Sequence, residues 1–275
     1  MTATVRMRVN GEDSATLNAL DRGLLYGDGL FETLAVRNGT PMRWERHLER
    51  LLLGCERLRI PSPDVSVLTT EALQLCKGQQ RAVLKVIITR GVGGRGYHAP
   101  AEPQPTRILA CQPWPAYPAD NAQDGVQLHL CSTRLAQQPA LAGIKHLNRL
   151  EQVLARAEWT DAALSEGLLF DRDDHVIEGT MSNLFLVCDG ALVTPDLSDC
   201  GVAGIMRAMI MEIAAELAVK CTVRAVARAE LFAASELLLC NSLIGIWPVC
   251  RLDKHHLQPG PLTRRLQQAL ELHHD

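Results

Sequence analysis

The sequence has no long hydrophobic run and no excess of basic residues, and each absence excludes a class of protein. No stretch approaches the roughly 20 apolar residues that a membrane-spanning helix needs. The first residues, MTATVRMRVNGED, contain no apolar core of a secretion signal. A formal net charge of −3 and a pI near 6.3 give no basic footprint for nucleic acid or anionic lipid. We therefore expect a cytoplasmic protein that binds neither membranes nor nucleic acids.

Paired cysteines are also missing. The chain has nine cysteines, an odd number, and none are spaced as C-x-x-C. This pattern argues against a disulfide framework and against a zinc site. We expect the cysteines to be small apolar residues in a reducing compartment, and we expect no metal site.

The length and the distribution of proline predict two domains. A chain of 275 residues, 47% of them hydrophobic, is long for one ordinary core. The polar, proline-rich run CQPWPAYPADNAQDG at 111–125 is the best candidate for a boundary. We predict a small N-terminal domain over 1–112, a linker over 113–125 and a larger C-terminal domain over 126–275. Strand and helix patterns alternate irregularly in both halves, which indicates an α+β class (α/β mixed) with mixed sheets.

Apolar periodicity predicts the individual elements. Alternating or buried apolar runs, several followed by Asn-Gly or Asp-Gly turns, predict strands over 5–9, 31–36, 84–89, 108–111, 126–130 and 237–240 and a hairpin around 189–190. Apolar residues at helical spacing predict helices over 48–58, 147–157, 205–219 and 262–270. The run RGVGGRGYHAPAEPQP at 90–105 is too rich in glycine and proline for regular structure.

Lysine is scarce, and two of the five lysines stand out. Lys77 and Lys254 lie in polar runs, and Lys220 ends an amphipathic helix, so we expect these three to be solvated. Lys85 falls inside an apolar strand. Lys145 lies between the apolar segment LAGI and the helix pattern HLNRLEQVL. Desolvation lowers the pKa of a lysine and makes its amine nucleophilic. The residues leave open whether Lys145 is reactive or is a solvated loop lysine, and Lys85 remains the alternative.

Three further features are ambiguous when taken singly. Glu178, in HVIEGTMSNLFLV, is either an exposed turn residue or a functional carboxylate. The segment DCGVAGIMRAMI begins a helix with small residues, and its backbone N–H groups are suited to an anion such as phosphate. Arg50 lies away from the apolar stripe of its helix, so we expect it in solvent unless it meets a second contact surface.

The loop RGVGGRGY at 90–97 invites a nucleotide-binding interpretation. It lacks the Lys-Ser/Thr end of a P-loop and does not match G-x-G-x-x-G in a strand-to-helix turn. Two alternatives remain open: a flap that carries Arg90, Arg95 and Tyr97 over a negatively charged substrate, or a plain solvated loop.

Five segments, taken in order, resemble one family. They are DRGLLYGDGLFETLAV at 21–36, HLERL at 47–51, the lysine at 145, EGTMSNLF at 178–185 and GVAGIMR at 201–207. Together they resemble the fold-type IV (class IV aminotransferase) family of pyridoxal-phosphate enzymes, and the resemblance covers nearly the whole chain. VLKVIITRGVGGRGY at 83–97 and LAGIKHLNRLEQVL at 141–154 are similar to the aminodeoxychorismate lyases of that family rather than to its transaminases.

The resemblance implies a role for each matching residue. Lys145 would be the Schiff-base lysine and the catalytic base, Glu178 would contact the pyridine nitrogen, and Arg50 would bind the cofactor phosphate. Further phosphate contacts would come from the backbone of Ile205 and Met206 and from the loop at Asn241 and Ser242. Transaminases usually have threonine in that loop and a hydroxyl residue at the position of Met206, so the side-chain contacts there depart from the family pattern. Arg95 or Tyr97 would bind a substrate carboxylate.

The resemblance also implies the activity. We expect a pyridoxal 5′-phosphate enzyme that eliminates pyruvate from aminodeoxychorismate and yields 4-aminobenzoate, a folate precursor. A homodimer with the cofactor between the two domains is expected from the same resemblance. The alternatives are a D-amino-acid or branched-chain transaminase of the same fold, a non-catalytic protein that stores or senses pyridoxal phosphate, and a nucleotide-binding module.

Overall fold

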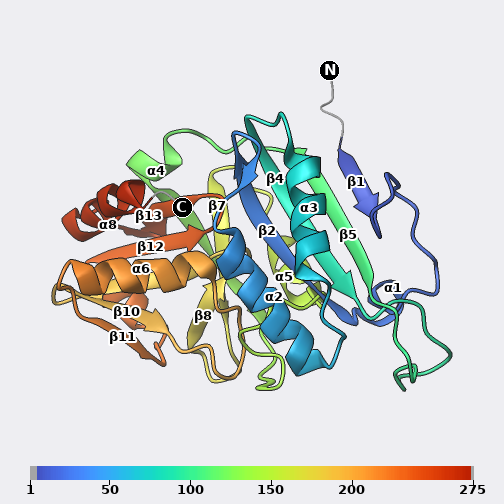
Figure 1. Ribbon diagram of the computed structural model, residues 1–275. Coiled ribbons are helices and arrows are strands. Elements are labelled where there is room, and N and C mark those ends of the chain that lie inside the picture. Colours follow the sequence, from blue (N-terminus) through green and yellow to red (C-terminus); the bar gives the residue numbers. More distant parts are fainter. Residues whose placement is uncertain (1–4, 274–275) are drawn as a thin grey trace. The chain divides into compact units, whose positions relative to one another are not determined.

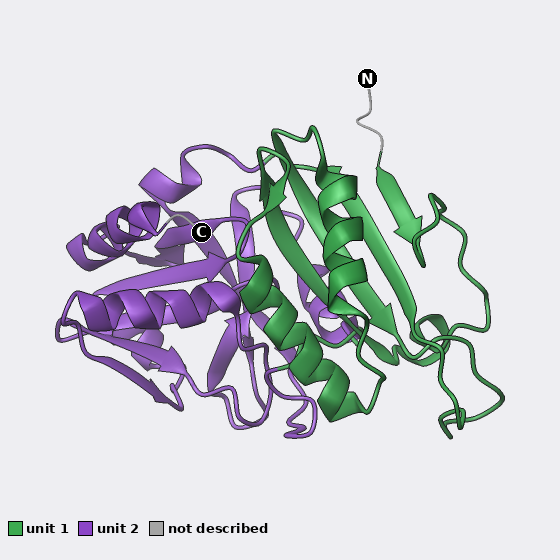
Figure 2. Ribbon diagram, in the orientation of Figure 1, with its two compact units in different colours: residues 1–116, 144–148 green, residues 117–143, 149–275 purple. Residues whose placement is uncertain are grey.

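The computed structural model describes residues 5–273, and this part of the chain forms two compact units (Figure 2). Unit 1 comprises residues 5–116 and 144–148, and unit 2 comprises residues 117–143 and 149–273. Both units combine helices with a β-sheet, so the predicted mixed α+β class is confirmed. None of the helices within residues 5–273 is long and apolar enough to cross a membrane.

Unit 1 is built on a five-stranded antiparallel sheet in the order β1-β5-β4-β2-β3. The strands are β1 (Arg6–Val9), β2 (Gly29–Arg37), β3 (Thr40–Pro41), β4 (Arg81–Thr89) and β5 (Thr106–Pro113). β2 and β4 pair along their whole length, from Gly29 opposite Thr89 to Arg37 opposite Arg81. Because side chains alternate along a strand, this long register fixes which residues of β2 and β4 share a face.

Helices cover one face of this sheet (Figure 1). Unit 1 contains α1 (Arg22–Tyr26), α2 (Trp44–Leu58) and α3 (Val65–Cys76). The sequence analysis gave no prediction for α3, which starts where the Asp64 carboxylate accepts hydrogen bonds from the N–H groups of Ser66 and Val67. α2 packs very close to β2, since a Cβ at Gly54 would lie 2.7 Å from Cδ2 of Leu30.

The short segment 144–148 runs beside the start of β2. The Phe31 N–H donates to the Lys145 carbonyl at 2.9 Å, and the Leu147 N–H donates to the Gly29 carbonyl at 3.0 Å. These bonds attach the segment to unit 1, although the chain before it and after it belongs to unit 2. The predicted helix over 147–157 is shorter in the structure, where α5 spans Leu150–Arg156.

Unit 2 is built on a nine-stranded mixed sheet in the order β11-β10-β9-β12-β13-β6-β7-β8, with β14 paired to β13. Its strands are β6 (Val126–Arg134), β7 (Leu164–Phe170), β8 (Val176–Gly179), β9 (Asn183–Cys188), β10 (Ala191–Pro195), β11 (Cys221–Arg224), β12 (Glu236–Asn241), β13 (Gly245–Leu252) and β14 (His255–His256). The hairpin predicted around 189–190 is confirmed, because β9 and β10 pair across Asp189 and Gly190. Both turn residues have positive φ, as a tight hairpin turn requires.

The helices of unit 2 are α4 (Asn121–Asp124), α5, α6 (Ile205–Glu216), α7 (Glu230–Ala233) and α8 (Pro261–Leu272). α6 and α8 lie side by side and cover one part of the sheet (Figure 1). Their buried side chains, Met206, Ile210 and Leu266 among them, share a core with Phe185 of β9 and Leu238 of β12. This packing fixes the first turn of α6, which the sequence analysis selected as an anion site.

Candidate active site

Two lysine amines lie against one aromatic ring of unit 1. Nζ of Lys145 is 4.6 Å from the ring centroid of Phe31, and Nζ of Lys85 is 5.0 Å from it. These are contacts between a cation and the face of a π-system. Both lysines are half-buried, whereas the three that the sequence analysis set aside are exposed. The two candidates left by elimination therefore meet at the same residue.

Strand register explains how Lys85 reaches the ring of Phe31. Lys85 of β4 stands opposite Thr33 of β2, and Phe31 is two residues before Thr33, so all three side chains share a face. Lys145 is carried to the ring by the backbone pairing between segment 144–148 and β2. Two amines beside one ring suit a small molecule that carries negative charge.

The opposite face of β2 carries a buried ionic network. Glu32 is 2% exposed and accepts hydrogen bonds from Arg50, at 2.8 Å from Nε and 2.5 Å from Nη2. Nδ1 of His47 lies 2.6 Å from the same carboxylate. Arg50 does not face solvent, because it meets a second contact surface at Glu32 of β2 and its side chain is only 10% exposed. The side of α2 that faces the sheet carries His47, Arg50, Leu51 and Gly54. The carboxylate of Glu32 on β2 compensates the charge of Arg50 at this position.

The charges in this network are well defined. Burial opposes ionisation of Glu32, but Arg50 and the hydrogen bond from His47 outweigh it and lower the pKa of Glu32 to about 2. Burial also lowers the pKa of His47, despite its contact with Glu32. At neutral pH the carboxylate is therefore ionised and the imidazole is neutral. Since an ionised carboxylate only accepts, Nδ1 of His47 must carry the proton and donate it.

The sequence analysis did not select Glu32 or His47. A signal for Glu32 was present, because it occupies the same strand face as the buried residues Leu30, Leu34 and Val36. A carboxylate within an apolar strand face needs a partner for its charge, and the next helix in the sequence carries a cation at Arg50. His47 gave no comparable signal, since a histidine next to a helix start is ordinary.

The glycine-rich loop at 90–105 is irregular, as predicted, and is attached through Arg22 of α1. The guanidinium of Arg22 donates to the carbonyls of Gly96, Tyr97 and His98 at 3.0–3.3 Å and pairs with Asp28 at 2.8 Å. The Tyr97 ring contacts Tyr26 edge-on at 5.4 Å but is 86% exposed. Arg95 is exposed too, so within unit 1 the structure presents both side chains to solvent rather than to the lysines.

In unit 2 a buried carboxylate, that of Glu178, lies near the end of β8. Oε2 of Glu178 accepts a hydrogen bond from the Val202 N–H at 2.8 Å and contacts Nδ2 of Asn183 at 3.4 Å. Glu178 is 5% exposed, so of the two alternatives for this residue the exposed turn is excluded. Glycines make the arrangement possible, since a Cβ at Gly204 would collide with the Asn183 side chain and one at Gly201 would lie 3.3 Å from Glu178.

The first turn of α6 follows at once. Gly204 is the N-cap, and this helix start has no side-chain cap. Ile205 and Met206 are buried in the core, so only their backbone N–H groups are suited to contact a ligand. The backbone role expected for these two residues fits this geometry.

The loop at Asn241 and Ser242 uses the asparagine side chain for its own structure. Oδ1 of Asn241 accepts hydrogen bonds from the N–H groups of Leu243 and Ile244, and Nδ2 donates to the Met181 carbonyl at 3.0 Å. Ser242 is half-buried beside it. In this loop, where transaminases usually have threonine, the side chain of Asn241 therefore shapes the turn.

A second buried carboxylate supports the segment after Glu178. Glu166 of β7 is 1% exposed and accepts hydrogen bonds from the hydroxyls of Thr180 and Ser182 and from the Met181 N–H. Burial raises the pKa of Glu166, although these hydrogen bonds oppose the shift. The sequence analysis did not select Glu166, which orders the loop between β8 and β9.

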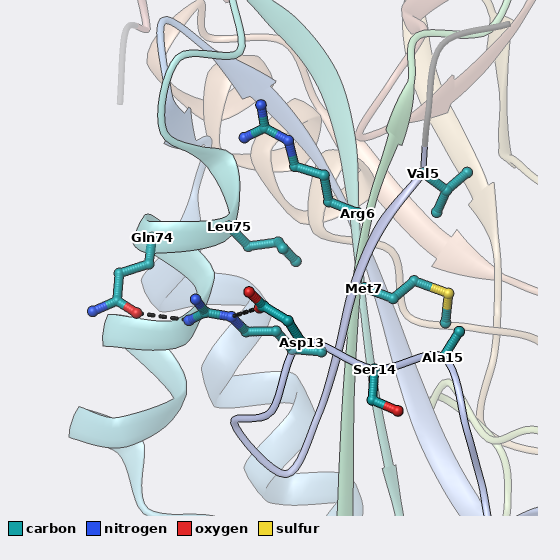
Figure 3. A pocket seen from close by; sticks show the side chains of 9 residues that line it. Val5, Arg6, Met7, Asp13, Ser14, Ala15, Gln74 and Leu75 are labelled. Atoms are coloured by element: carbon teal, nitrogen blue, oxygen red, sulfur yellow. Dashed lines mark hydrogen bonds and ion pairs between the residues drawn. The ribbon is translucent and has the colours of Figure 1, made fainter.

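Two other features involve none of these residues. A groove of about 550 Å³ on unit 1 is lined by β1, residues 13–15 and the end of α3, and Arg8 in it is already paired with Asp13 and Gln74 (Figure 3). Neither of the two lysines nor Phe31 lines this groove, so it is not part of the candidate site.

His129, Cys131 and Glu158 form a small cluster in unit 2, with ligand atoms within 4.8 Å of one another. Oxygens of Glu158 accept hydrogen bonds from the N–H groups of Ser132 and Thr133 and from the Thr133 hydroxyl, and one contacts His129 at 3.2 Å. Those bonds give Glu158 a structural task, to hold the end of β6.

Comparison with known proteins gives one consistent result. Residues 29–252 match the model of a family described as amino-transferase class IV. The chain is 38% identical over 266 residues to an aminodeoxychorismate lyase of Vibrio harveyi, covering 95% of this chain and 98% of that protein. It is similar to the crystal structure of 4-amino-4-deoxychorismate lyase from Pseudomonas aeruginosa, with 56% identity, a TM-score of 0.94 and coverage of 97% and 98%. A branched-chain amino acid aminotransferase structure from Escherichia coli is more distant, with 26% identity, a TM-score of 0.84 and coverage of 97% and 92%.

Proposed function

Because the chain belongs to the class IV aminotransferase family, we propose that it is a pyridoxal-phosphate-dependent lyase that converts 4-amino-4-deoxychorismate to 4-aminobenzoate and pyruvate. The structural observation that carries the proposal is the pair of amines at Phe31. One amine comes from the lyase-like segment LAGIKHLNRLEQVL, and the other supplies a second positive charge for a substrate with two carboxylates.

The residues of the candidate site fit pyridoxal phosphate. A reactive aldehyde needs a lysine, which Lys145 would provide. A phosphate needs cationic and N–H donors, which Arg50 and the first turn of α6 at Ile205 and Met206 would provide. A pyridine nitrogen that stays protonated needs a buried carboxylate, and Glu178 has that character. We propose that these residues bind the cofactor and that Asn241 and Ser242 add contacts to its phosphate.

The chemistry is then divided between the cofactor and the protein. Bound pyridoxal phosphate supplies an electron sink for the carbon that bears the substrate's amino group. Lys145 Nζ would remove the proton from that carbon, and the Glu178 carboxylate would stabilise a proton on the ring nitrogen. The C–O bond of the ether then breaks, and the enolpyruvate that leaves with the bonding electrons takes up a proton to become pyruvate. The remaining ring is aromatic, which makes the elimination favourable.

Cationic side chains of unit 1 would orient the substrate. Lys85 lies on the same strand face as Phe31, so it is suited to bind a carboxylate while Lys145 handles the proton. Arg95 and Tyr97 of the loop at 90–105 are proposed as further carboxylate contacts, reached when the loop covers the substrate. Their exposure leaves them available for such a contact.

We further propose that the protein works as a homodimer in the cytoplasm. Three large apolar residues of the short helix α5 are exposed: Leu150, Val153 and Leu154, at 75, 61 and 62%. A second copy of the chain would cover this apolar face. All nine cysteines are free thiols, which fits a reducing compartment.

The deciding experiment compares two products. Purified protein with pyridoxal phosphate and aminodeoxychorismate should release pyruvate and 4-aminobenzoate in equal amounts. Amino transfer from D-alanine or from a branched-chain amino acid to 2-oxoglutarate, with no pyruvate release from aminodeoxychorismate, would establish a transaminase instead. Cofactor binding without turnover of any of these amines would establish a storage or sensing protein.

A further inference from the structure

The contact between Glu32 and Arg50 has the geometry of a fork. Nε and Nη2 of the guanidinium each donate to a different oxygen of one carboxylate, at 2.8 and 2.5 Å. Two parallel bonds fix the plane of a guanidinium as well as its position, which a single bond cannot do. Arginine otherwise has large rotamer freedom, so the orientation of Arg50 depends on Glu32.

We propose that Glu32 is a positioning residue that orients Arg50 toward the cofactor phosphate. This rests on the proposed function, because it takes Arg50 as a phosphate contact. The pair uses two of the five N–H donors of the guanidinium, and the others are directed away from Glu32. The charge of Arg50 is largely neutralised by Glu32, so its value for phosphate binding lies in direction more than in net charge.

The surroundings hold Glu32 itself in place. His47 lies one helical turn before Arg50 on α2 and donates to the same carboxylate at 2.6 Å. Close approach of α2 at Gly54 brings both donors within reach of β2. A side chain held by its strand, its helix and two donors has little freedom, as a positioning residue requires.

A purely structural role is the competing explanation, since the network also ties α2 to β2. Unit 1 contains a second pair of this kind that serves as a matched control. Glu71 of α3 is buried and accepts two hydrogen bonds from Arg107 of β5, at 2.8 and 3.2 Å. Glu71→Gln removes the same charge from a similar fork that links another helix to the same sheet.

The test compares the affinity of the apoenzyme for pyridoxal phosphate and for pyridoxal, which lacks the phosphate. Glu32→Gln should weaken pyridoxal phosphate by about tenfold or more, the range expected for one charged hydrogen bond. The affinity for pyridoxal should change by less than about twofold, and Glu71→Gln should change the affinity for neither ligand. If Glu32→Gln fails to fold, Glu32→Asp, which keeps the charge but shifts the fork, should give the same selective loss.

Equal weakening of both ligands by Glu32→Gln, or no weakening, would overturn the positioning role. Arg50→Ala provides the coupling test, because Glu32→Gln should add almost no further loss of selectivity in that background. If the wild-type protein binds both ligands equally, the assignment of Arg50 to the phosphate fails and the proposal fails with it. Glu32→Gln could selectively weaken pyridoxal phosphate binding while the wild-type protein releases no pyruvate from aminodeoxychorismate. That result would support the positioning role and contradict the lyase function.

Discussion

Lys85 and Lys145 hold their amino groups against the same ring, 5.0 and 4.6 Å from the centroid of Phe31. The sequence left both as candidates for the reactive lysine, and their shared position does not by itself distinguish them. Different parts of the backbone carry the two lysines. Lys85 lies in the middle of β4, and Lys145 lies in segment 144–148, which pairs with the start of β2. Chemistry at each amine is therefore separable by substitution.

Substitution of Lys145 by alanine should abolish both covalent cofactor attachment and turnover. Loss of the base alone lowers the rate by about a hundredfold to ten-thousandfold, and loss of the tether adds to it. The absorbance band of the protein-bound cofactor and the rate of pyruvate release report the two effects. Lys85→Ala is the control, and it should keep the band and raise KM. A band that persists in Lys145→Ala and vanishes in Lys85→Ala would exchange the two assignments.

Glu178→Gln should lower kcat while the cofactor stays bound. The amide is close in size and its carbonyl oxygen still accepts the Val202 N–H, so the fold around it is kept. A neutral amide no longer stabilises a protonated pyridine nitrogen, and we expect a loss of about a hundredfold or more in kcat. Turnover rates measured at saturating cofactor and substrate check this. Unchanged turnover with normal cofactor content would remove Glu178 from the ring nitrogen.

Glu32 should make the stability of the protein sensitive to acid. Its pKa falls from 4.5 to about 2 on folding, so the unfolded state binds the proton more tightly. The stabilisation is fully present above pH 4.5 and is lost as the pH falls toward 2, with a total of about 3 kcal/mol. Urea unfolding midpoints of wild type and Glu32→Gln should differ clearly at pH 6 and converge toward pH 2.5. A gap that stays constant over this range would contradict the assigned shift.

Arg22→Ala should loosen the loop at 90–105. Three carbonyls of that loop, those of Gly96, Tyr97 and His98, lose their shared donor. We expect faster cleavage by trypsin after Arg95 and a KM that rises by about tenfold, the effect of one or two lost hydrogen bonds. Arg37→Ala, at an exposed strand end, is the control and should change neither quantity. A rise in KM without faster cleavage would separate substrate binding from loop order.

The exposed face of α5 should control association. Val153→Asp places a charge among Leu150 and Leu154 without disturbing a packed core, because Val153 is 61% exposed. Sedimentation should show a dimer for the wild type and a smaller species for this variant. Leu272→Asp changes another large apolar residue, 81% exposed in α8, and it should leave association unchanged. A wild type that sediments as a monomer would end the homodimer proposal.

Local pattern predicted most elements but failed where polar residues face inward. The strands at β2 and β4, the hairpin between β9 and β10 and the helices α6 and α8 follow apolar periodicity and turn residues closely. Periodicity misplaced Arg50 because it scores a charged residue as solvent-facing, whereas a buried partner on another element reverses that preference. No local pattern shows which strand lies beneath a helix.

The site was accessible from the sequence only through resemblance. The residues alone left open a solvated loop for Lys145 and an exposed turn for Glu178, but Lys145 is half-buried and Glu178 is buried. Other buried residues around the candidate site, such as Glu166 and His47, make contacts between segments far apart in the chain. Sequence spacing does not report such contacts.

The placement of segment 144–148 has a consequence for any attempt to divide the protein. Lys145 packs with the sheet of unit 1, yet the chain reaches it only after entering unit 2 and returns to unit 2 immediately afterwards. A gene fragment that ends at residue 116 would encode the five strands, Phe31 and Lys85 but not Lys145. One that begins at residue 117 would encode the lysine without its ring. A cut anywhere between residues 116 and 144 therefore leaves neither fragment with this pairing, so the gene cannot be divided at the boundary between the units without losing it.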